Sequence, residues 1–338
     1  MRNDAHQQIY LARLSIIGSR YVALGILCLI LAVPAQAQQH VFFQNGDIIA
    51  GGQTPSQIEA FGRFDWFLPD GTLNKRMAAP FNEWPSDFAF DSAGNVYSPT
   101  FFTVRIFDSS GRFARNFPRF PANWFTAIAF DRQGNAYISG SFNTGNLAKV
   151  DAAGNLLRTF ALPTDIGIGV FDLAADQCTI FYGNPVDRIR RYDVCNAAPL
   201  TDFVSIPSPG HLRILADGGL LVTSSDSIYR LNSSGVILRT YQVPGQLFWS
   251  GIAVDVDGRS FWAIGSGDSA FKFDIASGAQ MASFRSSDYL FDAITVVGEP
   301  RAALAGPPPS IPSLSNWMLA ALAASLIALA FIQLKNCA

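Results

Sequence analysis

This chain of 338 residues contains few histidines and glutamates, and its positive and negative charges are nearly balanced. The three histidines, His6, His40 and His211, lie too far apart for a zinc site of the usual spacing. Lysine and arginine total 24 against 26 acidic residues, so no basic field exists to attract nucleic acid. Neither a Gly-rich phosphate loop nor a G-x-S-x-G elbow occurs. These absences exclude the catalytic motifs that are most easily recognised.

The N-terminus has the order of a secretory signal. An apolar run (21–33) follows Arg2, Arg13 and Arg20 and precedes the small-x-small site of Ala35 and Ala37. The run is shorter than the roughly 20 residues that a membrane span needs. We therefore predict a signal peptide over 1–37 and a mature start near Gln38, with an uncleaved anchor as the alternative.

The C-terminus carries a second apolar segment. Residues 317–334 have no charged side chain and would reach about 27 Å as a helix, enough to cross a bilayer. Lys335 ends the run, and a Pro- and Ala-rich stretch (300–310) precedes the segment as a semi-extended linker. We predict a transmembrane helix over 317–334.

A short motif lies between this linker and the apolar segment. Its residues are Ile311, Pro312, Ser313, Leu314, Ser315 and Trp317. The order of motif, apolar helix and basic end resembles the IPTL class of C-terminal sorting signals, with Ser313 and Met318 in place of the usual Thr and Gly. The resemblance implies an exported protein of a Gram-negative envelope, processed by an exosortase-type membrane enzyme over 311–338. A plain membrane anchor is the alternative.

The region between the two ends, 38–299, is built from repeats. Segments 88–117, 128–160 and 252–284 each show four short strands, with an Asp and a Gly-containing turn after the first and third. Weaker copies cover 41–77, 170–203 and 212–241. Asp starts tight turns and Gly supplies positive φ, so turn glycines recur at intervals of about 40 residues or a multiple of it: Gly46, Gly94, Gly134, Gly218 and Gly258.

Four antiparallel strands repeated at this interval predict an all-β, six-bladed β-propeller, closed by pairing of 290–298 with the N-terminal repeat. The repeats resemble the NHL and streptogramin-lyase-like superfamily, which includes gluconolactonase-type enzymes. Those enzymes hold a divalent cation in the central channel with Glu, Asn and Asp. Here Glu59 and Glu83 are the only glutamates before Glu299, and most aspartates occupy turn positions.

The two cysteines of the body, Cys178 and Cys195, lie in the fourth repeat, whereas Cys28 and Cys337 fall in the terminal segments. CTIFYG (178–183) and RIRRYDVC (188–195) form a predicted hairpin that turns near Val186. Antiparallel pairing then places Cys178 opposite position 194 or 195, and we predict a disulfide in the oxidising exported compartment.

Three tryptophans recur before the first strand of a repeat, at Trp84, Trp124 and Trp249. We expect them in loops on the ligand-binding face, near Phe101, Phe102 and Phe142, where they either stack on sugars, grip a peptide or pack between blades. Two functions remain open. The favoured one is an exported or surface-anchored binding scaffold for a protein or carbohydrate, without cofactor or nucleic acid. The alternative is a lactonase-like hydrolase or lyase that uses a channel-bound divalent cation.

Overall fold

The computed structural model describes residues 39–54, 62–77, 83–117, 122–142, 145–164, 168–184, 186–265, 267–287 and 289–304. The predicted signal peptide with Ala35 and Ala37, the sorting motif from Ile311 to Trp317 and the predicted span 317–334 lie outside these residues. Within the described ranges, no helix is long and apolar enough to pass through a membrane.

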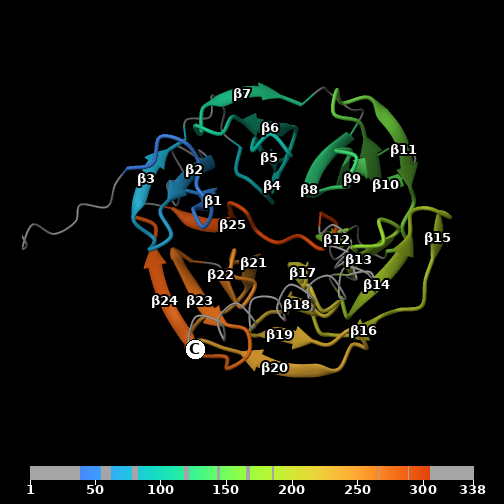
Figure 1. Ribbon diagram of the computed structural model, residues 1–338. Coiled ribbons are helices and arrows are strands. Elements are labelled where there is room, and N and C mark those ends of the chain that lie inside the picture. The colour runs from blue at the N-terminus through green and yellow to red at the C-terminus, as the bar shows by residue number, and fades with distance from the viewer. Residues whose placement is uncertain are drawn as a thin grey trace, which may run out of the picture. The chain divides into compact units, whose positions relative to one another are not determined.

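Six antiparallel β-sheets, here called blades, are arranged as a ring (Figure 1), and the central part of this ring is here called the channel. From the channel outward, the first blade contains β25 (Leu290–Val296), β1 (Ile48–Gln53), β2 (Gly62–Phe67) and β3 (Leu73–Arg76). The second contains β4 (Ala89–Phe90), β5 (Val96–Pro99), β6 (Val104–Phe107) and β7 (Phe113–Asn116). The third contains β8 (Ala122–Phe130), β9 (Ala136–Phe142), β10 (Gly145–Val150) and β11 (Leu156–Phe160).

The remaining three blades complete the ring. The fourth contains β12 (Phe171–Leu173), β13 (Thr179–Asn184), β14 (Arg188–Asp193) and β15 (Ala198–Pro199), with β16 (Val204–Ser205) also paired to β14. The fifth contains β17 (Leu212–Ile214), β18 (Leu220–Thr223), β19 (Ile228–Leu231) and β20 (Ile237–Tyr241). The sixth contains β21 (Trp249–Val254), β22 (Ser260–Gly265), β23 (Ser269–Asp274) and β24 (Gln280–Arg285).

The predicted six-bladed all-β fold and its mode of closure are confirmed. β25 pairs antiparallel with β1, from Ile48 opposite Val296 to Gln53 opposite Leu290, so the last strand of the ring is the innermost strand of the first blade. This shared blade joins the two ends of the repeat array and leaves no exposed edge at the junction.

The repeated Asp and Gly residues form the turns expected of them. In the second blade, Asp91 Oδ1 accepts hydrogen bonds from the N–H groups of Ala93 and Asn95, both at 2.9 Å, and Gly94 has φ +80°. The fourth blade lacks this glycine, and Gln177 adopts φ +66° in its place. The Gln177 side chain accepts a hydrogen bond from Arg132 N at 2.8 Å and donates one to Ala303 O at 2.7 Å. These contacts occur together with a backbone conformation that is unfavourable for a residue other than glycine.

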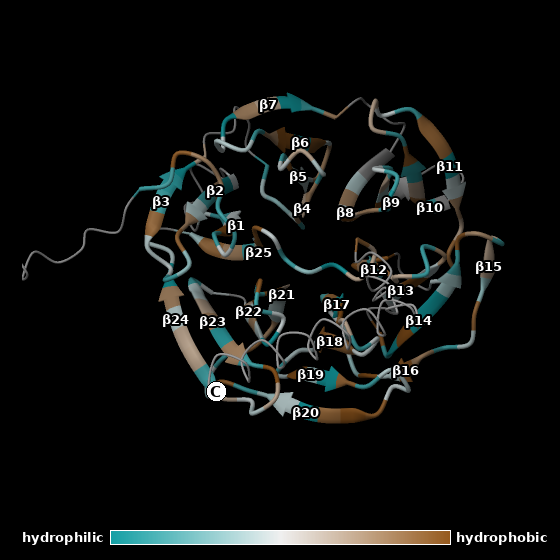
Figure 2. Ribbon diagram, viewed as in Figure 1, coloured by the Kyte–Doolittle hydropathy of each residue, from teal (hydrophilic) through white to brown (hydrophobic). Residues whose placement is uncertain are grey.

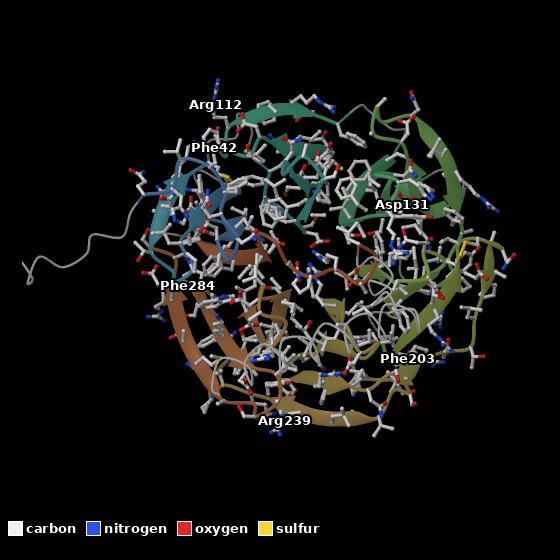
Figure 3. The ribbon with its side chains drawn as sticks, viewed as in Figure 1. Phe42, Arg112, Asp131, Phe203, Arg239 and Phe284 are labelled. Atoms are coloured by element: carbon white, nitrogen blue, oxygen red, sulfur yellow. A yellow bond between two sulfur atoms is a disulfide. The ribbon has the colours of Figure 1, made fainter. Side chains whose placement is uncertain are left out.

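Aromatic and aliphatic side chains fill the spaces between neighbouring blades. Between the sixth and first blades, Phe284 of β24 packs on Phe67 with ring centroids 4.8 Å apart (Figure 3). Gly71 lies so close to this contact that an added Cβ would be 2.5 Å from the Phe284 Cβ, and its φ is +85°. The outermost strands leave apolar residues in solvent, most clearly on β20, where Ile237 and Leu238 are about half exposed (Figure 2).

Candidate functional site

The innermost strands of all six blades begin at one face of the ring, here called the upper face. Three hydroxyl groups close to these strand starts each donate to a backbone carbonyl of the next blade. The pairs are Ser86 with Phe125 O at 2.8 Å, Thr126 with Ile168 O at 2.9 Å, and Ser250 with Phe291 O at 3.3 Å. These bonds connect successive blades around the mouth of the channel.

The mouth forms a pocket of about 390 Å³, here called the upper pocket. Every blade contributes to its lining through residues that include Trp84, Ser86, Thr126, Val170, His211, Trp249 and Asp292. Its volume falls within the range of about 300–1,000 Å³ that is usual for small-ligand sites.

Two ionisable groups of the upper pocket have perturbed pKa values. Asp292 accepts only a long hydrogen bond, 3.4 Å from Gln53 Nε2 to Oδ1, and its buried Oδ2 has no hydrogen-bond partner among the described residues. Burial raises the pKa of Asp292 to about 6. His211 keeps part of its surface at the pocket, yet burial lowers its pKa to about 4, so its ring is neutral at pH 7. The histidine is held through its backbone N–H, which donates to Thr223 Oγ1 at 2.7 Å.

The structure places the three tryptophans in different surroundings. Trp84 and Trp249 both line the upper pocket, Trp84 with 36% of its surface exposed and Trp249 with 3%. Trp249 begins β21 instead of lying in a loop, and its ring packs between blades against Phe271 and Phe273. Its buried Nε1 has no hydrogen-bond partner in the described part of the chain.

Trp124 lies within β8, again in a strand where a loop is expected from the sequence. It adopts φ +60°, is 61% exposed and packs against Phe101, with ring centroids 4.6 Å apart and the ring planes tilted by 40°. Phe102 meets the edge of Phe101 at 4.7 Å and is also 61% exposed. The side chain of Phe142 is outside the described part of the structure. Trp124, Phe101 and Phe102 thus form an exposed aromatic group whose residues do not line the upper pocket.

Deeper in the channel lies a chain of alternating charges, here called the channel network. Arg213 Nη2 is 3.1 Å from Asp87 Oδ1, and Arg213 Nε is 3.3 Å from Glu299 Oε1. Arg301 then approaches Glu299 at 2.9 Å and Asp172 at 3.8 Å. Burial raises the pKa of Asp172. Burial by itself would lower the pKa of Arg213, but the attraction of Glu299, Asp87 and Asp172 outweighs this effect, so the pKa of Arg213 is raised.

The network also accepts backbone hydrogen bonds from other blades. Asp87 Oδ2 accepts from Ile128 N at 3.1 Å, and Asp172 Oδ2 from Ile214 N at 3.0 Å. Glu299 Oε1 accepts from Val254 N at 2.7 Å. The carboxylates therefore join the second blade to the third, the fourth to the fifth, and the C-terminal segment to the sixth.

Glu299 and Arg301 come from the segment that follows β25 and crosses the centre of the ring towards β12 (Figure 1). Ala302 and Ala303 are buried in it, so the packed body extends beyond the predicted boundary at residue 299. Sequence reasoning missed the network, although charges flanked by apolar residues in the innermost strands FDL (171–173) and LRI (212–214) are a usable signal. Glu83, for which the sequence suggests no partner, lies 3.3 Å from Arg105.

The channel network does not match a divalent-cation site. Two guanidinium groups lie among its three carboxylates, at the position where a cation would have to bind. In the described residues, the single set of three potential metal-binding side chains within reach of one another is Cys178, Asp193 and Cys195. The two sulfur atoms of that set are bonded to each other, 2.00 Å apart.

This disulfide lies in the fourth blade, at the outer side of the ring beside β14 and β15 (Figure 3). Thr179 pairs with Asp193 across the hairpin of β13 and β14, and Val194 N donates to Cys178 O at 2.8 Å. The hairpin therefore brings Cys178 and Cys195 to opposite strand ends, with Cα atoms 5.2 Å apart.

The opposite face, where the innermost strands end, carries a larger hollow of about 600 Å³, here called the lower pocket. Turns of the second and third blades and the C-terminal segment as far as Leu304 line it. Its aspartates are already engaged: Asp131 accepts from Asn135 in its own turn and pairs with Lys149 Nζ at 2.8 Å, and Asp91 accepts from Asn95. These two aspartates serve the turns, as the repeats predict, whereas Asp172, Glu299 and Arg301 of the channel network also line this pocket.

Comparisons with known proteins are informative about the fold alone. No family model matches the chain, and no curated protein is significantly similar to it. A protein of unknown function from Bacteroides caccae matches with a TM-score of 0.60 and 12% identity, over 76% of this chain and all of that one. A chain of a nidogen/laminin complex matches with a TM-score of 0.60 and 14% identity, over 75% of this chain and all of that one. At these identities the likeness shows a shared propeller fold.

Proposed function

We propose that this protein is an exported β-propeller that binds a ligand at the upper pocket and is tethered to the cell envelope through its C-terminus. The observation that carries the binding role is the convergence of all six blades on one pocket, which Trp84 borders with 36% of its surface exposed. A concave pocket with aromatic and apolar lining and a few polar groups is the usual form of a small-ligand site.

The proposed export and attachment to the cell envelope rest on the two terminal segments of the sequence. In this proposal the signal peptide is removed after Ala37, and an exosortase-type enzyme processes the motif around Pro312 while the helix 317–334 holds the protein in the membrane. The path of the described chain supports this arrangement. Leu304 lines the lower pocket, and near the N-terminus Phe43 N donates to Ser109 O in a turn on the same lower face. Leu304, the last described residue, is therefore on the face opposite the upper pocket, and in this proposal the tether begins there.

A binding role is favoured over a cation-dependent hydrolase because of Arg213 and Arg301. A divalent cation in the channel would meet two positive charges that are already paired with Asp87, Asp172 and Glu299. The residues present therefore do not fit a lactonase-type metal site.

Binding can be tested with the mature protein on arrays of glycans and peptides. We expect at least one class of probe to bind, Trp84→Ala to abolish that binding, and Trp124→Ala to leave it unchanged, because Trp124 is an exposed tryptophan outside the upper pocket. Divalent-cation-dependent hydrolysis of lactones or esters, lost in a channel variant, would instead support the enzymatic alternative.

Processing can be tested separately in the native host. We expect Pro312→Ala and Trp317→Ala to cause accumulation of the unprocessed, membrane-bound form, whereas Pro309→Ala, a proline just outside the motif, should be handled like the parent. Intact-mass analysis measures both ends of the exported chain. Identical processing of all three variants would leave the segment as a plain anchor.

A further inference from the structure

The closing seam, here meaning the pairing of residues 290–293 of β25 with residues 51–53 of β1, contains a β-bulge. The register shifts between Gly51 and Gly52, and Asp292 is the residue of β25 that the pairing skips. The bulge depends on glycine, because a Cβ added at Gly52 would overlap Leu290 O and lie 2.9 Å from Asp292 N. The bulge therefore places the Asp292 carboxyl group within the strand pair on which closure of the ring depends.

The Asp292 carboxyl group has few stabilising contacts. Oδ1 accepts a long hydrogen bond of 3.4 Å from Gln53 Nε2, and the buried Oδ2 has no hydrogen-bond partner among the described residues. The strands packed against β25, which are β1, β21 and β22, contain no charged residue. The nearest elements beyond them carry, at their upper ends, Arg63, Glu83, His211, Asp268 and Arg285. The pKa of Asp292 is raised by burial and lowered by the bond from Gln53, without a contribution from these charges.

Ionisation of this carboxyl group favours local opening of the closing seam. A buried carboxylate without a cation or a short hydrogen bond is unfavourable, which is why burial raises the pKa of Asp292 to about 6. Asp292 borders the upper pocket and lies two residues after Leu290, which begins β25 and is 42% exposed. Separation of these first residues of β25 from β1 brings Oδ2 into water. It breaks only the hydrogen bonds at this end, among them Phe291 N to Gly267 O at 2.8 Å.

We propose that Asp292 is a pH-sensitive latch: the closing seam is shut when this carboxyl group is protonated and opens locally when it is ionised, while the rest of the ring stays folded. Because the folded pKa of about 6 lies above the ordinary value of 3.8, the stability that the proton contributes is complete below about pH 4. It is lost as the pH rises through about 6. The latch needs no ligand at the upper pocket.

The test uses the full-length mature protein in detergent, the variant Asp292→Asn and the control Asp226→Asn, which changes an exposed aspartate between β18 and β19. Carbon NMR titration of the Asp292 carboxyl group in the parent, assigned by sequential connectivity, should give a midpoint at about pH 6. Hydrogen exchange read by mass spectrometry, corrected for the intrinsic exchange rate at each pH, measures protection of the closing seam. From pH 5 to pH 7.5 this protection should fall about tenfold or more in the parent and in Asp226→Asn, and less than about twofold in Asp292→Asn.

Urea unfolding gives a second measure. Between pH 4 and pH 7.5 the folding equilibrium constant of the parent should decrease relative to that of Asp292→Asn by up to about 100-fold, as a pKa difference of about two units requires. His211 is common to both chains, so its effect cancels. A carboxyl midpoint near pH 4, or seam protection that depends on pH equally in the parent and in Asp292→Asn, would overturn the latch. Protection that falls equally in all six blades would overturn local opening. If Asp292→Asn does not fold, the titration and the exchange of the parent and of Asp226→Asn decide between these outcomes.

Discussion

Replacing Arg213 with methionine removes the central positive charge of the channel network while keeping a side chain of similar length. Arg213 has 2% of its side chain exposed and contacts Asp87 at 3.1 Å and Glu299 at 3.3 Å. After the change, Glu299 still has Arg301 at 2.9 Å, but Asp87 is left with a backbone hydrogen bond from Ile128 and no cation among the contacts of the described structure.

Removing one partner of a buried ion pair is destabilising by about 3–5 kcal/mol, because the other charge stays buried without compensation. At about 2–4 °C per kcal/mol for a domain of this size, the melting temperature should fall by about 6–20 °C. Arg213→Met combined with Asp87→Asn should recover most of the loss, since asparagine can still accept the Ile128 hydrogen bond and carries no charge.

Urea unfolding of the two single variants and the double variant measures these changes as a double-mutant cycle. Arg285→Met is the matched control, because Arg285 pairs with Asp268 at 3.2 Å but is 74% exposed, and such surface pairs contribute about 0–1 kcal/mol. If Arg213→Met is no more destabilising than Arg285→Met, or if Asp87→Asn restores nothing, the network does not hold the blades as argued.

Three further changes test other parts of the fold. Replacing Cys178 and Cys195 with serine should destabilise the protein by about 3 kcal/mol, and a non-reducing peptide map should recover the linked pair; free labelling of both thiols after export would contradict this. Through His211, the parent should lose at most ~3 kcal/mol of stability as the pH falls from about 6.5 to 4, because the unfolded His211 ring accepts a proton that the folded ring resists. His211→Gln should remove this loss. A parent-to-variant difference that is constant between pH 7.5 and 4.5 refutes this. Gly71→Ala should be more destabilising in urea than Gly134→Ala by at least 1 kcal/mol, since both have positive φ but only Gly71 has a close neighbour; equal losses would remove the steric argument.

The features that the sequence predicts well are those encoded within one repeat. Asp91 and Gly94 form a tight turn through bonds spanning a few residues, and the same pattern in other repeats defines the number of blades. Closure by β25 follows from a single additional strand pattern. The fourth-blade hairpin is also local, with Cys178 and Cys195 separated by 17 residues.

The parts that escaped prediction depend on residues far apart in the chain. Arg213 is 126 residues from Asp87 and 86 from Glu299, so no local pattern shows that the three meet. The same limit applies to the tryptophans. Trp124 and Trp249 occupy similar positions before an Asp turn, but only Trp249 packs edge to face with Phe271 and Phe273 of β23 in the same blade.

The route of the chain after β25 has a mechanical consequence for a protein held by its C-terminus. A pull on Leu304 acts first on the buried Ala303 and on the ion pairs of Arg301 and Glu299, before it reaches the hydrogen bonds between β25 and β1. These ion pairs connect to Asp87, Asp172 and Arg213 in the second, fourth and fifth blades. The tension is therefore distributed across the ring instead of separating β25 from β1. We expect the propeller to resist stretching from this end, and pulling on Glu299→Gln in optical tweezers should open the closing blade at lower force.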